Sequence, residues 1–431
     1  MNKCYFSIII LATLLIGCGS DNFGDEIVQP IAQEEPSTQG EQENDAAAPV
    51  VNLTVQQQKA MTQNNDFAFD YYRTVSRSEV VKGKSFVVSP ISLTCLLGMV
   101  NAGASGQTRQ EITRMLGSEG NNSAFVDELC SLMIDKVPLL DNSVSLGISN
   151  MVVTNQPVSL SETYADLLSE YYDAETSTLQ FATPEAVSYV NAWCRQHTNG
   201  RIPSIVESLD GSIALLNAVS FKAPWSGKFD KNATRNETFI REDGSHLSLP
   251  MMHRDDLCYY YKGDNFKAVG LPFGTGENWS MYAILPDEGY SVDEVSRSLT
   301  ADAWQNCVSK MTRGARQVDV KLPRFTVQSD VQLRDVLKQM GCESMFLPLG
   351  ELASMTSLGS GLSVGMVKQK ASIEVTEEGS EAAAVTIAVV YTSEGPDAED
   401  AKCRFYADRP FIYLIQENTT QAVFFIGTFR G

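Results

Sequence analysis

The sequence predicts a single domain of the α+β class that runs from about residue 56 to residue 431. Segments with apolar residues at helical spacing, such as 65–72, occur along the same stretch as short β-branched runs, such as 145–153. The chain of 431 residues is 43% hydrophobic, which suffices for a large core, although length alone allows two or three domains. No linker or repeat interrupts this stretch, so we expect one continuous domain.

The first elements can be placed by their caps and breakers. Asn65 or Asp66 is expected to cap a helix that continues to Tyr72. A strand over 85–88 leads into Ser89-Pro90, and a second apolar helix is expected from Ser92 through Val100. A third helix should begin at Gln107 and end at Gly117, since glycine favours helix C-termini.

Strands are expected in the middle and at the end of the chain. Strand-like runs occur at 145–153, 215–221, 280–285 and 317–322. Residues 415–430 indicate a hairpin whose second strand is entirely apolar and therefore buried.

The N-terminus indicates export. Lys3 precedes an apolar run from Tyr5 to Ile16, which is too short to span a bilayer comfortably. The run ends in Leu-Ile-Gly-Cys, which resembles the bacterial lipobox, so residues 1–17 are interpreted as a signal peptide and Cys18 as the lipidated N-terminus. An ordinary secretory peptide with a chance cysteine is the alternative.

Residues 18–55 are acidic, rich in Gln and Pro and poor in large apolar side chains. Such a composition cannot offset the entropy of ordering, so we expect a flexible tether. Together with the lipid on Cys18, it predicts a membrane-anchored protein of the bacterial cell envelope, held at the outer membrane or the cell surface.

Charge and motifs exclude several classes of function. The formal net charge of −20 argues against nucleic acid and against activation by a polyanion. The seven cysteines beyond Cys18 are scattered without metal-ligand spacing and are expected to be free and mostly buried. Neither a phosphate-binding loop nor an HExxH motif occurs, so no catalytic residue, metal site or cofactor is expected and an enzyme is disfavoured.

Residues 374–393, EVTEEGSEAAAVTIAVVYTS, contain a local conflict. The acidic and alanine-rich first half favours a helix, whereas Val385 to Tyr391 favours a strand, and Gly379 lies between them. If the run is a strand, one of its faces carries small uncharged side chains from Ser380 to Val390, which suits entry into a packed interior. Such a conflict between local preferences often marks a functional segment.

These segments together resemble the serpin family over essentially the whole of residues 56–431. The resemblance is carried by seven pieces in the family's order, none of which would be specific alone. They are FVVSPISLTCLLGMVNAGASGQTRQEI (86–112), VNAWCRQHTNGRIPSI (190–205), LNAVSFKAPWSGKFD (216–230), LPMM (249–252), LPRFTVQSDVQL (322–333), the run at 374–393, and ADRPFIYLIQENTTQAVFFIG (407–427).

The resemblance implies a fold of about nine helices around three β-sheets with an exposed reactive-centre loop at about 377–405. It also implies suicide inhibition, in which a target protease cuts the loop and is trapped covalently while the loop inserts into the main sheet. The hinge of that loop would be Glu377, Glu378, Gly379, Ser380, Glu381, Ala382, Ala383 and Ala384, where Ser380 replaces a commoner Thr.

The family's spacing places the scissile bond at Ser393-Glu394, with bonds at Tyr391 and Thr392 as the nearest alternatives. No Lys or Arg occurs between Lys370 and Lys402, which disfavours a trypsin-like target. We expect a serine protease of elastase-, chymotrypsin- or subtilisin-like specificity, with a papain-like cysteine protease as the alternative.

Four further residues match positions that control opening of the main sheet in the family. Ser89, Ser92 and Asn217 match a polar cluster beneath the opening, and Trp225 matches an aromatic residue where the hinge first enters. Ordinary buried packing is the alternative interpretation of all four. The family commonly has His where this chain has Gln369, which puts the usual hydrogen-bond network and any pH gating through it in doubt.

Two other functions remain open from the residues. The first is a non-inhibitory serpin that acts as a carrier or chaperone, and the second is a surface adhesin whose loop binds a partner. The expected hinge residues closely match those of inhibitory members of the family, which favours inhibition over both of these alternatives. We also expect a monomer that is prone to loop-sheet polymers, because the run Val385–Tyr391 has high β-propensity.

Overall fold

The computed structural model describes residues 51, 53–118, 124–311, 317–356, 361–380 and 403–431. All of them belong to one compact unit, Ala48–Gly431. Within these ranges the chain forms nine α-helices and three β-sheets, which confirms the predicted α+β class. The helices are α1 (Val55–Ser76), α2 (Pro90–Gly103), α3 (Gly106–Met115), α4 (Ala124–Asp135), α5 (Glu162–Tyr172), α6 (Pro184–His197), α7 (Val292–Ser298), α8 (Ala301–Ser309) and α9 (Arg334–Gln339), with short 3-10 helices at Val137–Leu140, Ser344–Phe346 and Ala353–Met355.

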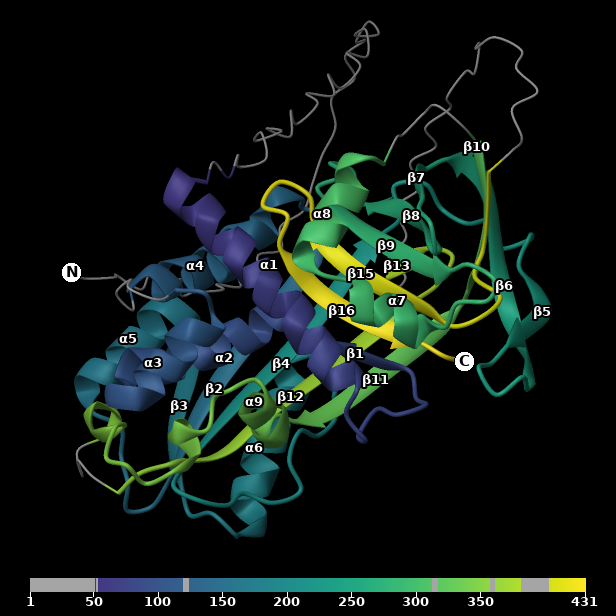
Figure 1. The fold of residues 1–431 in the computed structure, drawn as a ribbon. Coiled ribbons are helices and arrows are strands. Elements are labelled where there is room, and N and C mark those ends of the chain that lie inside the picture. Colours follow the sequence, from purple (N-terminus) through teal and green to yellow (C-terminus); the bar gives the residue numbers. More distant parts are fainter. Residues whose placement is uncertain (1–50, 52, 119–123, 312–316, 357–360, 381–402) are drawn as a thin grey trace, which may run out of the picture. The chain divides into compact units, whose positions relative to one another are not determined.

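The main sheet has the strand order β11-β12-β4-β2-β3, with a short strand β13 paired to β4 (Figure 1). Strands β12 and β4 are parallel to each other, whereas β12 pairs with β11, and β4 with β2, in the antiparallel sense. We call the β12–β4 pairing the seam. The strands are β2 (Ser145–Asn155), β3 (Ala174–Leu179), β4 (Ile213–Pro224), β11 (Phe325–Gln332), β12 (Val364–Val375) and β13 (Gly379–Ser380).

Two further sheets complete the fold. One has the order β1-β16-β15-β9-β8-β7, and the other has the order β14-β10-β6-β5. The expected C-terminal hairpin is β15 and β16, and both of its strands are buried throughout. The strands are β1 (Phe86–Val88), β5 (Arg235–Ile240), β6 (His246–Leu257), β7 (Tyr259–Lys262), β8 (Phe266–Phe273), β9 (Trp279–Pro286), β10 (Gln317–Pro323), β14 (Cys403–Tyr406), β15 (Phe411–Glu417) and β16 (Val423–Phe429).

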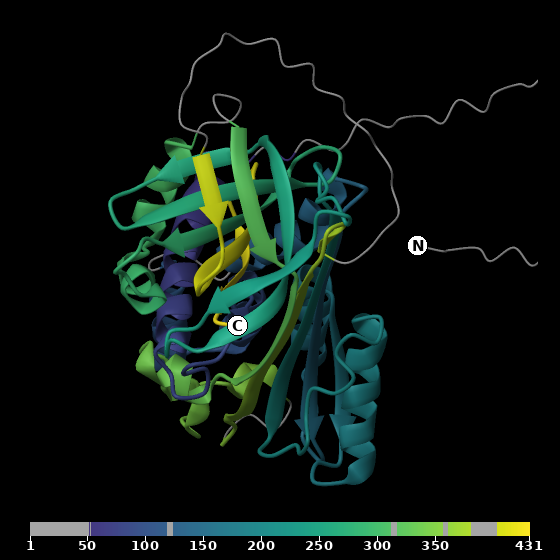
Figure 2. The ribbon, with the colours of Figure 1, turned by 90° about the vertical axis from the view of Figure 1, so that its right-hand side faces the viewer.

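Two apolar clusters pack against the main sheet. The larger cluster includes residues of α1, α2 and the hairpin β15–β16, and side chains of β4 such as Val219 face it. The smaller cluster joins Val190 and Trp193 of α6 to Leu216 of β4 and Met366 of β12. Helix α6 therefore covers one face of the main sheet, as Figure 2 shows, while most of the described chain packs on the other face.

The first helices differ from the sequence expectation at their starts. Helix α1 begins at Val55, ten residues before the expected cap, because Thr54 forms a capping box with Gln57. Asn65 lies inside this helix, and its side chain instead donates to the carbonyl of Gln421. Helix α2 begins at Pro90 rather than Ser92, since proline is well suited to a first helical position.

The described part of the chain holds no helix that is long and apolar enough to cross a membrane. All seven cysteines beyond Cys18 are free thiols; six are buried and Cys403 is half-buried. No group of three or more His, Cys, Asp or Glu side chains within the described ranges is placed to hold a metal ion.

Candidate functional site at the seam of the main sheet

The chain turns back on itself at the end of β12. After Val375, the residues Thr376–Glu378 form a tight reversal closed by the Thr376 N–H, which donates to the Gly379 carbonyl at 2.9 Å. Strand β13 then pairs with β4 in the antiparallel sense, so that Gly379 lies opposite Pro224 and Ser380 opposite Ala223. The two hinge residues thus lie against the strand that forms one side of the seam.

Gly379 is required at this reversal. Its φ of +147° lies in a region that side chains rarely adopt, and an added Cβ would lie 2.0 Å from the Ala223 carbonyl oxygen. The following Ser380 is buried, and its Oγ has no hydrogen-bond partner among the described residues. The close approach to β4 therefore depends on the smallest side chains.

Two carboxylates anchor the turn between β12 and β13. Glu377 is buried and accepts hydrogen bonds from Arg324 Nη2 at 2.5 Å and Thr234 Oγ1 at 2.7 Å. Burial alone would raise the pKa of Glu377, but the hydrogen bonds from Arg324 and Thr234 hold that pKa below its ordinary value.

The neighbouring Glu378 forms ion pairs with Lys228 at 2.6 Å and with Lys231 at 2.7 Å. Hydrogen bonds from these two ammonium groups lower the pKa of Glu378. We call Glu377, Glu378 and their four partners the entrance latch. It fixes the root of the hinge by charge at one end of the seam.

Trp225 lies beside the latch, immediately after β4. Its indole Nε1 donates to the Thr376 carbonyl at 2.8 Å, and its backbone N–H donates to the Glu378 carbonyl at 2.9 Å. The ring is stacked on Phe273 with the centroids 4.2 Å apart. Trp225 therefore contacts the turn between β12 and β13 directly.

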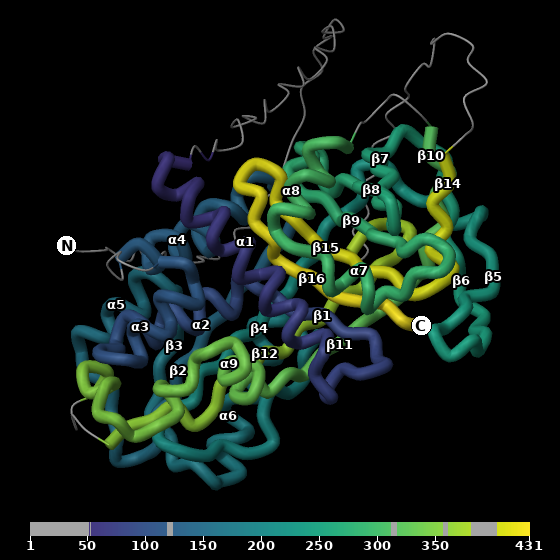
Figure 3. Tube along the Cα trace, viewed as in Figure 1, coloured from purple at the N-terminus to yellow at the C-terminus, as the bar shows by residue number. Residues whose placement is uncertain are grey.

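A neutral polar cluster lies beneath the middle of the seam. The Oγ atoms of Ser89 and Ser92 are 2.9 Å apart and both side chains are buried. Gln369 of β12 hydrogen-bonds to the backbone of Ser89, and it lies opposite Asn217 of β4 in the seam register. The structure thus brings Ser89, Ser92, Asn217 and Gln369 into one region. This region lies where α2 passes β4 and β12 (Figure 3). The amide of Gln369 therefore forms hydrogen bonds of its own at the position where the family commonly has His.

Other expected site residues lie outside the described part of the chain. They are the hinge residues Glu381, Ala382, Ala383 and Ala384, the scissile pair Ser393 and Glu394, the alternatives Tyr391 and Thr392, and the lipidation site Cys18.

Sequence reasoning missed the four residues that hold Glu377 and Glu378 in the entrance latch. Arg324, Lys228, Lys231 and Thr234 lie between 53 and 150 positions before their partners, so no local pattern connects them. The spacing of Lys228 and Lys231 in an acidic chain is the one signal that could have indicated a carboxylate partner.

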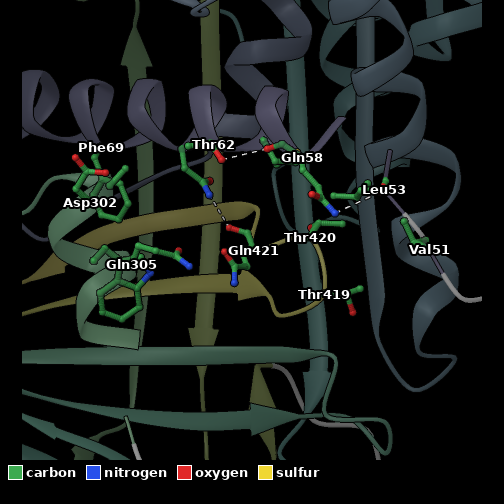
Figure 4. A pocket seen from close by; sticks show the side chains of 14 residues that line it. Val51, Leu53, Gln58, Thr62, Phe69, Asp302, Gln305, Thr419, Thr420 and Gln421 are labelled. Carbon is green, nitrogen blue, oxygen red and sulfur yellow. Dashed lines mark hydrogen bonds between the residues drawn. The ribbon is translucent and has the colours of Figure 1, made fainter. Parts of the chain in front are cut away.

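A cavity of about 540 Å³ lies away from the seam, between α1, α8 and the β15–β16 turn (Figure 4). Trp304, Met61 and Phe69 supply apolar walls, and neutral amides such as Gln305 and Gln421 supply hydrogen-bonding groups. None of the residues that form the entrance latch lines it. The cavity is therefore a separate feature from the hinge.

Comparisons with known proteins agree with this arrangement. The family profile described as Serpin (serine protease inhibitor) matches residues 62–430. An uncharacterized serpin-like protein of Thermococcus kodakarensis is 30% identical over 435 residues, which cover 99% of this chain and 98% of that protein.

Solved structures show the same fold. The thermophilic serpin tengpin in its native state superposes with a TM-score of 0.78 at 24% identity, covering 89% of this chain and 96% of tengpin. Thyroxine-binding globulin in complex with thyroxine superposes with a TM-score of 0.77 at 22% identity, covering 86% and 99%. The family is one of protease inhibitors that are generally not enzymes, although thyroxine-binding globulin binds thyroxine. The protein whose seam and hinge are described above belongs to the serpin family.

Proposed function

We propose that this protein inhibits a protease by suicide covalent trapping, in which the cut loop enters the seam as a new central strand. The observation that supports this most directly is β13, because Gly379 and Ser380 already pair with β4 in the antiparallel sense. A strand that continued from Ser380 along the seam would be antiparallel to both β4 and β12, since those two are parallel to each other. β13 is therefore the first step of such an insertion.

The chemistry would come from the protease and the strain from the inhibitor. The nucleophilic hydroxyl of the protease attacks the carbonyl of the scissile residue near Ser393, the peptide C–N bond breaks, and an ester to the protease forms. The new amine at Glu394 takes the proton from the general base of the protease. Hydrolysis of the ester would require an intact oxyanion hole in the protease. Loss of one hydrogen-bond donor from an oxyanion hole lowers the catalytic rate by about 10²–10³.

Insertion would carry the protease the length of the sheet. A strand of about 15 residues at roughly 3.3 Å per residue spans about 50 Å. It would exchange the direct ladder between β12 and β4 for two ladders, each hydrogen bond contributing about 0.5–1.5 kcal/mol net. The state with the loop uncut is therefore kinetically rather than thermodynamically stable.

We infer a target of elastase-, chymotrypsin- or subtilisin-like specificity, because no basic residue lies between Lys370 and Lys402. A serine protease is the first choice and a papain-like cysteine protease the second. The proposed setting is the bacterial cell envelope, where a lipid on Cys18 and the acidic tether hold a monomeric inhibitor at the membrane.

A carrier function is the second candidate, and the cavity between α1 and α8 is the observation that favours it. Its volume of about 540 Å³ falls within the range of small-molecule sites. A carrier would need no loop insertion. Heat resistance that is unchanged after loop cleavage would favour the carrier over the inhibitor.

The test is incubation of the full chain with pancreatic elastase and with chymotrypsin, followed by a denaturing gel and intact mass. Trapping predicts a covalent band at the summed mass and a released peptide that begins near Glu394. The matched control is Ser380→Arg, which puts a long cation where a buried hydroxyl faces β4 and should turn the inhibitor into a plain substrate. Cleavage by both enzymes without a covalent band, and without a gain in heat resistance, would exclude the proposal.

A further inference from the structure

We propose that Cys95 and Cys130 form a disulfide site, and that a bond between their sulfurs joins α2 to α4 when the chain folds in an oxidising compartment. The structure describes the dithiol form of this pair. Both side chains are buried, with an exposure of 0%. The inference goes beyond protease inhibition and holds whether or not the protein traps a protease.

The hydroxyl of Tyr172 shows how closely α2 and α4 approach each other. It donates to Asp127 Oδ1 of α4 at 2.5 Å. On the side of α2, a Cβ added to Gly98 would lie 2.6 Å from the same hydroxyl oxygen. Both helices therefore contact one atom, and the missing side chain of Gly98 leaves the room for this close approach.

The two cysteines lie one helical turn from these contacts. Cys95 precedes Gly98 by three positions on α2, and Cys130 follows Asp127 by three positions on α4. Residues three apart are neighbours on one face of a helix, with their Cβ atoms about 5–6 Å apart. Both thiols therefore lie on the helix faces that meet at Tyr172, within the larger apolar cluster.

The protonation of the thiols agrees with this placement. Burial, followed by a hydrogen bond with the Cys95 thiol, raises the pKa of the Cys130 thiol well above its ordinary value. Burial also raises the pKa of Cys194 and of Cys307, but no second thiol contributes at either of them. The pair of Cys95 and Cys130 thus differs from these two cysteines in having a partner sulfur within hydrogen-bonding reach.

Formation of the bond is a two-electron oxidation that needs a second disulfide, carried by an oxidoreductase or by a small molecule. A thiolate of the pair attacks one sulfur of that disulfide, so that a mixed disulfide forms and one thiol leaves. The other cysteine of the pair loses its proton and attacks the mixed disulfide at the cysteine sulfur. This step closes the bond between Cys95 and Cys130 and releases a second thiol. The reagent is thereby reduced to two thiols, which carry the two protons that the cysteines have lost.

Burial determines when this exchange can occur. The thiolate is the reactive form of cysteine, and it must be reachable by the reagent. Neither sulfur is accessible in the folded protein, and the raised pKa of Cys130 keeps that thiol protonated. The exchange therefore takes place before α2 and α4 have closed over the pair. The redox state of the pair is then set by the compartment in which the chain folds.

The bond would stabilise the fold through the unfolded chain. It would close a loop of about 35 residues, from position 95 to position 130, and so lower the entropy of the unfolded state. For a chain of this size, we expect the melting temperature to rise by about 5 °C.

The test is made on the full chain exported to the periplasm of a bacterial host, with and without the disulfide-forming oxidoreductase of that host. The protein is denatured, alkylated without a reductant and cut with trypsin, which places Cys95 in peptide 85–109 and Cys130 in peptide 115–136. The two peptides should be joined in the protein from the oxidising host and separate in the other. The joined form should also melt about 5 °C higher.

Two variants and one reagent control this comparison. Cys130→Ala should abolish the difference in melting temperature between the two hosts, whereas Cys194→Ala, which removes a buried thiol without a thiol partner, should retain it. Oxidised glutathione added to the folded dithiol form should modify the half-buried Cys403 and leave Cys95 and Cys130 as thiols.

The proposal is overturned if peptides 85–109 and 115–136 are alkylated separately in the protein from the oxidising host, or if either is joined to a different cysteine peptide. Equal melting of the joined and separate forms would overturn the stabilising effect. Because the peptides are mapped in the wild type, the result stands even where Cys130→Ala fails to fold.

Discussion

The two places where the seam is held use opposite physical means. At the entrance, carboxylates of Glu377 and Glu378 meet three cationic side chains, two of which are substantially exposed. At the centre, Gln369, Asn217 and Ser89 are neutral and buried. Charge at a surface can be switched by pH, salt or a partner, whereas a buried amide responds to none of these. The entrance is thus the adjustable end of the seam, and the centre is the fixed one.

The largest effect on the entrance and on trapping is expected from Gly379→Ala. The added Cβ would lie 2.0 Å from the Ala223 carbonyl at a φ of +147°, so β13 must leave β4 or the turn must distort. Strain of this kind costs about 1–3 kcal/mol. We expect faster amide hydrogen exchange over 376–380 and several-fold more cleaved substrate per trapped protease. Unchanged exchange and unchanged trapping would show that the β13 pairing has no role at the entrance.

The buried Asp127 of α4 provides a test of whether stability in the region around the centre of the seam depends on pH. Burial raises the pKa of Asp127 to about 6, while the hydrogen bond from Tyr172 opposes that rise. Because the folded-state pKa is raised, stability is greatest at low pH and is lost as pH rises from about 4 through about 6. Asp127→Asn should therefore raise the free energy of unfolding at pH 7–8 by about 2–3 kcal/mol.

Urea unfolding at several pH values measures this difference between Asp127→Asn and the wild type. Equal gains at pH 4 and pH 8 would contradict the assignment of the pKa. A matched control is Tyr172→Phe, which removes the hydrogen bond to Asp127 and should raise the pKa further.

Glu377→Gln should weaken the entrance by a moderate amount. The variant keeps an acceptor for Thr234 but loses the charge that pairs with Arg324, at a cost of about 1–3 kcal/mol above pH 5. Because the pKa of Glu377 is lowered in the fold, its contribution is present above the unfolded pKa and lost as pH falls below about 4. The wild type and the variant should therefore converge in acid, as measured by the melting temperature of the uncut protein between pH 3 and pH 7. A difference that persists at pH 3 would point to packing rather than charge.

The smallest effect is expected from Lys231→Met. Lys231 is 64% exposed, and Lys228 remains to pair with Glu378. Such an ion pair is worth about 0.5 kcal/mol or less, and added salt should remove it. The difference in melting temperature between Lys231→Met and the wild type, measured in 10 mM and in 500 mM salt, gives the size of this contribution and its dependence on salt. A loss that exceeded that of Glu377→Gln would reverse the ranking of the two carboxylates.

The fold and the residues beneath the seam could be predicted from the sequence, but the contacts that hold the turn between β12 and β13 could not. β1, α2, β4 and the β15–β16 hairpin could be predicted because their apolar periodicity and breakers are local. Ser89, Asn217 and Trp225 could be located through the resemblance of whole segments to a family. The start of α1 was missed because Thr54 and Gln57 form their capping box in a polar stretch that resembles the tether in composition. Arg324 and Thr234 could not be predicted as partners of Glu377, since only the folded sheets bring them together.

The pairing of β13 with β4 has a kinetic consequence. In the terms of polymer physics, adding a strand to a sheet begins with a nucleus of first residue pairs. Forming that nucleus costs entropy, because the intervening chain must close onto the sheet. Here the nucleus is already present, because the reversal at Thr376–Gly379 and the two pairs with Pro224 and Ala223 exist before any bond is cut. In the proposed mechanism, a cut loop would only have to extend this existing pairing along β4, one residue pair at a time. The competition between hydrolysis and trapping would then begin with the slow nucleation step already complete.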